Sequence, residues 1–318
     1  MNPTLIEDIQ KKLADAEAIT ILSHLNPDAD ALGTSLGIYA LLKAQGHKRV
    51  EVVNASSTLA RSLDFLPYFD KIKSTMDYEH SLVIACDCGS ISRLGFPLEG
   101  REIINIDHHR SNTHYGLINV VIPEYAASSQ VAYEVFKEIY PLDKNVATCF
   151  YTALLSDTRY FTTATVDKKV FAFAEVLIDL GANPASIASS MTERRPLSAF
   201  RILEKALASL ELRDEARIAV VKVSKKEIAE TGAEIPDMEG IVEYAKSLVS
   251  VELALFAMEL TGEIRISVRS KNVDVSALAL AFGGGGHKLA AGFTIKQCAL
   301  HESIDIILKK IENLRIIR

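Results

Sequence analysis

The sequence has no long apolar run, no excess of basic residues and no segment that resembles a signal peptide. No stretch reaches the roughly 18 consecutive apolar residues that mark a membrane-spanning helix, and residues 1–16 are acidic and amphipathic rather than apolar. The formal net charge is −6, whereas proteins that wrap long nucleic acids hold them with many lysines and arginines. We therefore expect a cytoplasmic protein that has no membrane partner and does not wrap long polynucleotides.

Cysteine is also scarce, with four residues in the chain. Cys86 and Cys88 lie two positions apart on a predicted strand, where side chains are offset along the strand and do not face each other. We expect reduced and largely packed thiols, which agrees with a reducing cytosol.

The length of 318 residues suggests two domains. The first half shows short apolar runs that alternate with helical patterns, and this alternation predicts an α/β fold with a mostly parallel sheet covered by helices on both faces. The predicted strands are 18–22, 50–53, 82–85 and 103–106. The predicted helices are 4–16, 31–45, 128–140, 145–155 and 166–180.

The second half has a different pattern, in which longer strand-like runs and helices predict a smaller α/β module. We divide the chain into a catalytic domain at 1–185, a linker at 186–210 that contains a helix from 197, and a second domain at 211–318. In the second domain the predicted strands are 218–223, 251–260 and 263–269, and the predicted helices are 237–250, 274–281 and 301–312.

Several predicted strands of the first half end in residues that bind metals. The first is followed by a loop with His24, Asp28 and Asp30, and the third by Asp87. Because an open α/β sheet builds its site at the carboxyl ends of its strands, we expect these side chains to converge. Oxygen-rich ligands with one or two imidazoles favour a hard divalent ion, Mn²⁺ or Mg²⁺, over structural zinc.

The sharpest signal is the run Asp107-His108-His109, which follows a buried strand directly. The other acids have simpler explanations when they are taken singly. Asp28 and Asp30 fit the start of a helix, Asp87 fits a loop cap, and Asp157 fits the last turn of a helix. Only their joint occurrence points to a two-metal phosphoesterase centre.

A glycine run near the C-terminus is the other candidate site. Gly283 to Gly286 lack side chains, so backbone N–H groups can approach a phosphate closely, and His287 adds a donor. Arg269 and Ser270 end the preceding strand and offer further phosphate partners. A flexible hinge is the alternative interpretation of the same run.

These residues resemble the motifs of the DHH phosphoesterase superfamily. The resemblance spans nearly the whole chain and is greatest to its stand-alone bacterial enzymes, the nanoRNases, or bifunctional oligoribonucleases and PAP phosphatases. The catalytic motifs are His24-x-x-Pro27-Asp28-x-Asp30, Asp87, Asp107-His108-His109 and Ser156-Asp157-Thr158. Arg269-Ser270 and Gly284-Gly285-Gly286-His287 resemble the signature of the DHH-associated substrate-binding domain.

The resemblance implies a parallel-sheet catalytic domain, a linker and a smaller domain that closes over the substrate. It also implies two divalent cations, Mn²⁺ in the first place with Mg²⁺ or Co²⁺ as alternatives. One ion would be held by His24, Asp28 and Asp87, and the other by Asp30, Asp87 and His108. Asp157 would complete the cluster, Asp107 would orient a histidine and His109 would face the scissile phosphate. Arg269, Ser270, Gly284, Gly285, Gly286 and His287 would bind the substrate.

The implied activity is that of a hydrolase, a Mn²⁺-dependent phosphodiesterase, exoribonuclease and phosphatase. It would cleave short RNAs, including pGpG-type dinucleotides, to mononucleotides and would convert 3′-phosphoadenosine 5′-phosphate (PAP) to AMP. A homodimer is also implied. Ala29 and Arg159 stand where glycine is frequent in the family, and Arg159 bears on substrate preference.

The alternatives are other enzymes and a non-enzyme. They are a phosphodiesterase for cyclic or linear dinucleotides, a RecJ-like single-strand exonuclease, an inorganic pyrophosphatase and a non-catalytic nucleotide sensor. A RecJ-like enzyme would need an additional nucleic-acid-binding domain, and a sensor would have lost metal ligands that are all present in this sequence.

Overall fold

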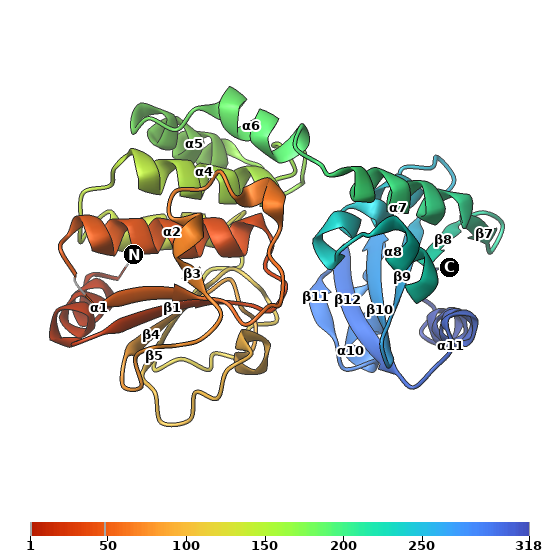
Figure 1. Cartoon of the computed structure of the whole chain (residues 1–318), viewed down its shortest axis with the longest axis horizontal. Coiled ribbons are helices and arrows are strands. Elements are labelled where there is room, and N and C mark those ends of the chain that lie inside the picture. The colour runs from red at the N-terminus through yellow and green to blue at the C-terminus, as the bar shows by residue number, and fades with distance from the viewer. Residues whose placement is uncertain (1, 48, 318) are drawn as a thin grey trace. The chain divides into compact units, whose positions relative to one another are not determined.

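The computed structural model describes residues 2–47 and 49–317. The chain forms two compact units, Met1–Arg194 and Arg195–Arg318, each with its own sheet (Figure 1). The segment 186–210, predicted as a linker, covers the end of the first unit and helix α7 (Leu197–Ala208). In α7, Ile202 and Ala206 are fully buried in a core of the second unit.

The first unit contains a six-stranded sheet in the order β3-β2-β1-β4-β5-β6. All of its strand pairs are parallel, which confirms the predicted parallel sheet. The chain moves from β1 to β2 and β3 on one side, then returns to β4 on the other side of β1, so the strand order reverses between β1 and β4. The strands are β1 (Ile19–Ser23), β2 (Val50–Val53), β3 (Ile72–Lys73), β4 (Leu82–Cys86), β5 (Ile103–Asp107) and β6 (Ile118–Val121).

Apolar side chains on both faces hold this sheet in place. In the central strands, Ile21 pairs with Val52 on one side and with Ile84 on the other, and all three belong to the large core on the helical face. Alternate residues such as Val83 and Ala85 point to the opposite face. The 3₁₀ helix η3 (Ile91–Leu94) covers that face together with neighbouring loops and buries Leu94.

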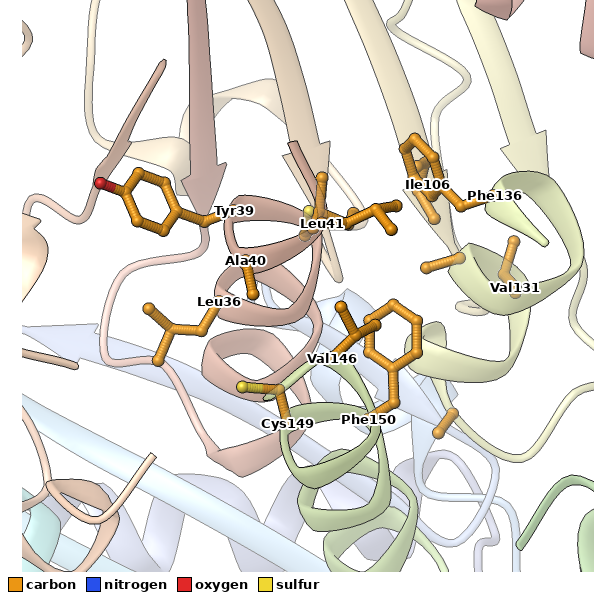
Figure 2. Packing of buried hydrophobic residues seen from close by; sticks show 14 of the residues in the cluster. Leu36, Tyr39, Ala40, Leu41, Ile106, Val131, Phe136, Val146, Cys149 and Phe150 are labelled. Atoms are coloured by element: carbon orange, nitrogen blue, oxygen red, sulfur yellow. The ribbon is translucent and has the colours of Figure 1, made fainter. Parts of the chain in front are cut away.

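Helices α2, α4, α5 and α6 of the first unit lie above the sheet in Figure 1. Helix α2 is buried along nearly its whole length and packs against α4. Leu36 and Leu41 of α2 belong to one core with Val146 and Phe150 of α4 (Figure 2). The helices are α1 (Pro3–Asp15), α2 (Ala29–Ala44), α3 (Ser128–Phe136), α4 (Lys144–Asp157), α5 (Lys168–Asp179) and α6 (Pro184–Thr192). The segment after β2 contains the 3₁₀ helices η1 (Arg61–Leu63) and η2 (Phe69–Lys71).

The second unit contains a mixed sheet in the order β11-β12-β10-β9-β8-β7. Only β8 and β9 pair in parallel; the other described pairs are antiparallel. One face buries a core with α10 and α11, and the other a core with α7 and α9. Its strands are β7 (Glu211–Arg213), β8 (Ile218–Val223), β9 (Leu253–Leu260), β10 (Glu263–Ser270), β11 (Gly285–His287) and β12 (Ala290–Lys296). Its other helices are α8 (Lys225–Thr231), η4 (Ile235–Met238), α9 (Ile241–Lys246), α10 (Ser276–Ala281) and α11 (Leu300–Asn313).

Two predictions for the second unit were wrong. The single helix predicted at 237–250 is divided into η4 and α9, because Gly240 has a φ of 80° and interrupts the helical backbone. The glycine run was given no strand and had a flexible hinge as its alternative interpretation, but its last residues form the edge strand β11. Within residues 2–47 and 49–317, no single helix is long and apolar enough to cross a membrane. Helices α5 and α6 reach that length and composition only as a pair bent by 104°.

Candidate metal centre

The candidate metal ligands gather where the strand order reverses, beyond the carboxyl ends of β1, β4 and β5. This is the position at which open α/β sheets form their sites. Asp28 is the N-cap of α2 and accepts a hydrogen bond from the Ala31 N–H at 3.0 Å. The helix begins at Ala29, so Asp30 lies in its first turn and not in the loop where it was predicted. Asp157 is likewise the last residue of α4.

Two sets of donor atoms form at this edge of the sheet. His24, Asp28 and Asp87 each offer one donor atom within 4.8 Å of the others, and Asp30, His108 and Asp157 do the same. Asp87 lies between the sets, because its Oδ2 is 3.6 Å from His24 Nε2 and its Oδ1 is 3.6 Å from His108 Nε2. One carboxylate therefore faces both sets with different oxygens.

Backbone carbonyls orient both imidazoles of these sets. His24 Nδ1 lies 2.8 Å from the Leu25 carbonyl oxygen, and His108 Nδ1 lies 3.2 Å from that of Tyr125. A carbonyl oxygen can only accept, so each Nδ1 is the donor, and in the neutral ring each Nε2 keeps its lone pair for a cation. The histidines are therefore held in the tautomer that metal binding requires.

The N-terminus of α3 supports the carboxylates from a third direction. The backbone N–H groups of Ser128 and Ser129 donate to Asp30 at 2.7 and 3.3 Å, and Thr34 donates to it at 3.0 Å. The Ser128 hydroxyl also donates to Asp87 Oδ1 at 2.9 Å. These donors fix the carboxylates and partly offset the cost of burying them.

Asp107 is fully buried and holds the start of the following loop. Its Oδ1 accepts from the backbone N–H groups of His108 at 2.8 Å and His109 at 3.2 Å, and lies 2.7 Å from His109 Nδ1. Its Oδ2 accepts from Asn112 Nδ2 at 2.5 Å. Asp107 therefore orients the His109 ring, and also lies near Asp87 in a third group of donor atoms.

Burial and mutual charge shift the titration of this cluster. Burial is the main influence on Asp30 and raises its pKa well above the usual value, and the charges of Asp87 and Asp157 act in the same direction. Burial also acts to raise the pKa of Asp87, but the hydrogen bond from His24 and the nearby imidazoles outweigh it and lower that pKa. Burial opposes charging of His108, but Asp157 and Asp30 outweigh it and raise its pKa well above 6.5.

This donor set fits divalent cations. Five buried or half-buried carboxylates share the site with three imidazoles, and bound cations would offset their mutual repulsion and desolvation. Carboxylate oxygens with two imidazole Nε2 atoms match the preferences of hard or intermediate divalent ions. The protons that the imidazoles hold without metal would be released when cations bind.

The candidate substrate residues of the second unit lie at one end of its sheet. In the strand register Ala290 pairs with Arg269 of β10 on one side and with His287 of β11 on the other. Arg269 Nε donates to Glu243 at 3.0 Å. Ser270 is buried, and its hydroxyl donates to the Val273 carbonyl at 2.5 Å, so it supports the chain locally.

The glycines of this segment serve different purposes. A Cβ at Gly284 would lie 2.2 Å from the Gly292 carbonyl oxygen, and one at Gly286 would lie 2.5 Å from that of Ala290. Both are required for close approach to β12. A Cβ at Gly285 would meet nothing within 4 Å, so the space on that side of Gly285 is open.

Sequence reasoning missed several residues that contact the metal centre. Thr34, Ser128 and Asn112 donate to Asp30, Asp87 and Asp107, and Arg93 lies beside His24. Ser128 had a usable signal, since a serine pair at a predicted helix start offers free N–H groups to an anion. The other three carry no local pattern that distinguishes them from ordinary polar residues.

Comparisons with known proteins agree with this architecture. The model of the DHH family N-terminal domain matches residues 18–154, and that of the DHHA1 domain matches residues 215–314. A relative from Thermus thermophilus, the bifunctional oligoribonuclease and PAP phosphatase NrnA, is 30% identical over 298 residues, which are 92% of this chain and 89% of the relative.

Two solved structures share the fold. An exopolyphosphatase-related protein from Bacteroides fragilis is 25% identical, with a TM-score of 0.86 over 98% of this chain and 97% of its own. RecJ from Thermus thermophilus in complex with Mn²⁺ is 15% identical, with a TM-score of 0.58 over 98% of this chain and 55% of its own. The chain therefore belongs to the DHH family, with the DHH domain in its first unit and a DHHA1 domain in its second.

Proposed function

We propose that the protein is a metal-dependent phosphoesterase that hydrolyses short oligoribonucleotides to mononucleotides and PAP to AMP. The observation that carries this proposal is the position of Asp87, which presents one oxygen to each of two histidine-containing donor sets. A shared carboxylate between two such sets is the arrangement that two-metal phosphoester hydrolysis needs. The oligoribonuclease and PAP phosphatase among its relatives supports the substrate class.

In this proposal His24, Asp28 and Asp87 hold one divalent cation, and Asp30, Asp87 and His108 hold the other. Asp157 completes the cluster, and its Oδ2 lies 3.1 Å from His108 Nε2. Bound cations supply Lewis-acid activation of water and neutralise charge on the phosphoryl oxygens. We infer Mn²⁺ as the ion, because imidazole and carboxylate together suit it better than Mg²⁺.

His109 and Asp107 are the proposed catalytic pair of the protein itself. Asp107 engages Nδ1 of His109, so Nε2 is the atom that would meet a phosphoryl oxygen of the substrate. Burial lowers the His109 pKa, but the hydrogen bond to Asp107 and the charge of Asp87 outweigh it and raise the pKa above 6.5. A protonated His109 can stabilise the negative charge that develops during attack on phosphorus.

The second unit would bind a further part of the substrate through Arg269, His287 and the backbone at Gly285. Two strand spacings of roughly 4.8 Å each separate the strands that carry Arg269 and His287, a span that one nucleotide can bridge. Ser270, Gly284 and Gly286 would support this substrate-binding face through their contacts inside the unit. A homodimer and a cytoplasmic location stay predictions.

The test is product analysis with Mn²⁺ on pGpG, a 5-mer RNA, a 24-mer RNA, PAP and pyrophosphate. We expect rapid release of mononucleotides from the short RNAs and of AMP from PAP, with slow cleavage of the 24-mer. Preference for the 24-mer would indicate a processive nuclease, and hydrolysis of pyrophosphate alone would contradict the nucleotide assignment.

A further inference from the structure

Arg93 places a positive charge directly beside the candidate metal centre. It belongs to η3, on the loop between β4 and β5, and its side chain is exposed. Its Nη2 lies 3.3 Å from Nδ1 of His24, the ring nitrogen opposite the one that faces Asp87. The guanidinium therefore lies at the rim of the centre, on the far edge of the His24 ring.

The backbone around Arg93 is fixed to the loop that carries His24. The Arg93 carbonyl accepts from the Leu25 N–H at 2.7 Å, and Leu94 is fully buried beneath it. Gly95 ends η3 with a φ of 78°, and a Cβ there would lie 2.7 Å from Ala55 and 3.0 Å from Leu25. The base of the arginine is thus anchored although its guanidinium is exposed.

The hydrogen-bonding capacity of His24 leaves Arg93 without an acceptor there. His24 Nδ1 donates to the Leu25 carbonyl at 2.8 Å whenever Nε2 is free for a cation. A protonated Nδ1 cannot accept from Arg93, which is itself only a donor. When His24 is in the tautomer that binds a cation, its Nδ1 therefore cannot accept a hydrogen bond from Nη2 of Arg93.

No carboxylate of residues 2–47 and 49–317 lies within the 4.0 Å ion-pair distance of Arg93. Arg110, which follows β5, differs in this respect, because it pairs with Glu124 at 3.9 Å. An anchored guanidinium at the rim of a phosphoesterase centre, with neither an acid nor His24 to accept from it, suits an anionic ligand.

We propose that Arg93 binds a second phosphate group of the substrate, one that is not hydrolysed. The phosphate that reacts would lie on the Nε2 side of His24, where the cations bind, whereas Arg93 lies on the Nδ1 side. The ligand chemistry is a phosphate monoester, which a 5′-phosphorylated dinucleotide and PAP both carry. Arg93 is thus a specificity residue that favours substrates with two phosphates, and this inference rests on the proposed function.

The kinetic test compares substrates with and without the second phosphate. Arg93→Ala and wild type are assayed on pGpG against GpG, and on PAP against adenosine 3′-monophosphate. We expect KM for pGpG and PAP to rise about 10- to 100-fold in the variant, as for loss of a charge-assisted hydrogen bond, while kcat and the values for the singly phosphorylated substrates stay within about twofold. Arg93→Lys should recover part of the loss.

A binding measurement makes the test independent of turnover. Calorimetry on the Mn²⁺-loaded protein uses a methylphosphonate-linked diguanosine, which resists hydrolysis, with and without a 5′-phosphate. We expect Arg93→Ala to remove the preference for the 5′-phosphorylated ligand. If Arg93→Ala loses a preference that wild type shows, yet wild type cleaves none of the substrates, the proposed activity fails while the role of Arg93 stands.

Two controls decide whether the effect belongs to Arg93 itself. Arg110→Ala also removes one positive charge near the centre. An equal rise in KM for pGpG and PAP in both variants would overturn the proposal, because it would show that any nearby positive charge has the same effect. Mn²⁺ affinity is measured in Arg93→Ala as well. A lowered affinity would mean that Arg93 acts on His24 rather than on substrate, and an unchanged preference for the 5′-phosphate would also overturn the proposal.

Discussion

The two sheets of this protein assemble their candidate sites in different ways. In the first unit, His24, Asp87 and His108 meet because the parallel strands that they follow end at one edge and the strand order reverses there, and helix α4 adds Asp157. In the second unit, Arg269 and His287 lie level with each other on either side of β12, because both pair with Ala290 of that strand. In the parallel sheet, the strand order determines which side chains meet. In the mixed sheet, the residue pairing between strands determines it.

The sites also differ in electrostatics. The first concentrates carboxylates that cations or imidazolium groups can balance, and its donor residues are buried or half-buried. The second presents an arginine on the internal strand β10 and a histidine on the edge strand β11, which suits an anionic ligand. The predicted consequence is that changes in the first unit remove metal and turnover, while changes in the second alter substrate affinity or local stability.

The largest effect is expected for His108→Ala. This change removes an Nε2 that lies within 3.1 to 3.7 Å of Asp157, Asp87 and Asp30, so turnover of pGpG should fall roughly 10³-fold or more. The exposed His80→Ala is the matched control and should keep wild-type activity. Retained turnover in His108→Ala after reconstitution with Mn²⁺ would contradict the assignment.

The glycines of the second unit offer a matched pair. Gly284→Ala should destabilise this unit by roughly 1–3 kcal/mol, because the new Cβ would meet the Gly292 carbonyl at 2.2 Å. Gly285→Ala should change stability by less than about 0.5 kcal/mol and should raise KM for pGpG. Chemical denaturation and kinetics check both, and equal stability of the two variants would refute the distinction between packing and open glycines.

Between pH 6.5 and 9 the stability of the metal-free protein should depend on pH mainly through the buried histidines of the first unit. The folded-state pKa values of His24, His108 and His109 are raised above 6.5 because acidic partners outweigh the effect of burial. Their protonation therefore stabilises the fold fully below about pH 6.5, and this contribution is lost as the pH rises through the raised values. The lowered pKa of Asp87 has its effect only in acid.

Melting curves with EDTA should therefore show a lower Tm at pH 9 than at pH 6.5, and hydrogen exchange should place the loss in residues 2–47 and 49–194. Added Mn²⁺ should reduce this dependence, since cations take the place of the protons. A metal-free Tm that rises over the same interval would show that the imidazoles are not held in their charged form.

The smallest effect concerns the turn after Asp157. Arg159, Tyr160 and Phe161 have φ values of 45°, 57° and 62°, a left-handed run that is unfavourable for residues with a side chain. Arg159→Gly should stabilise the first unit by up to about 1 kcal/mol, whereas Arg110→Gly, outside any left-handed position, should not. Destabilisation by Arg159→Gly would mean that contacts of the arginine outweigh the backbone strain.

Much of the first unit was predictable because its signals are local. Buried runs such as 82–85 and 103–106 lack alternation and end in acids, which indicates parallel strands with functional ends. The start of α2 was misplaced by two residues, because Asp28 caps the helix in addition to its candidate role as a ligand. Arg93 and Asn112 were missed because their contacts depend on tertiary structure.

The second unit was less predictable for the same physical reason. Strand β11 consists of Gly285, Gly286 and His287, which have little intrinsic preference for a strand, and it forms only because β12 provides a partner. Ser270 matched a substrate motif, yet its hydroxyl is bonded to the Val273 carbonyl within the unit. No local sequence pattern predicts strand register or backbone contacts of this kind.

The most direct test of the two-metal centre is the number of Mn²⁺ ions bound by wild type and by Asp87→Asn, measured by calorimetry together with turnover of pGpG. We expect wild type to bind two ions per chain, and Asp87→Asn to bind at most one and to lose turnover, because the shared carboxylate faces both donor sets. Two bound ions and retained turnover in Asp87→Asn, or a single ion in wild type, would contradict this account.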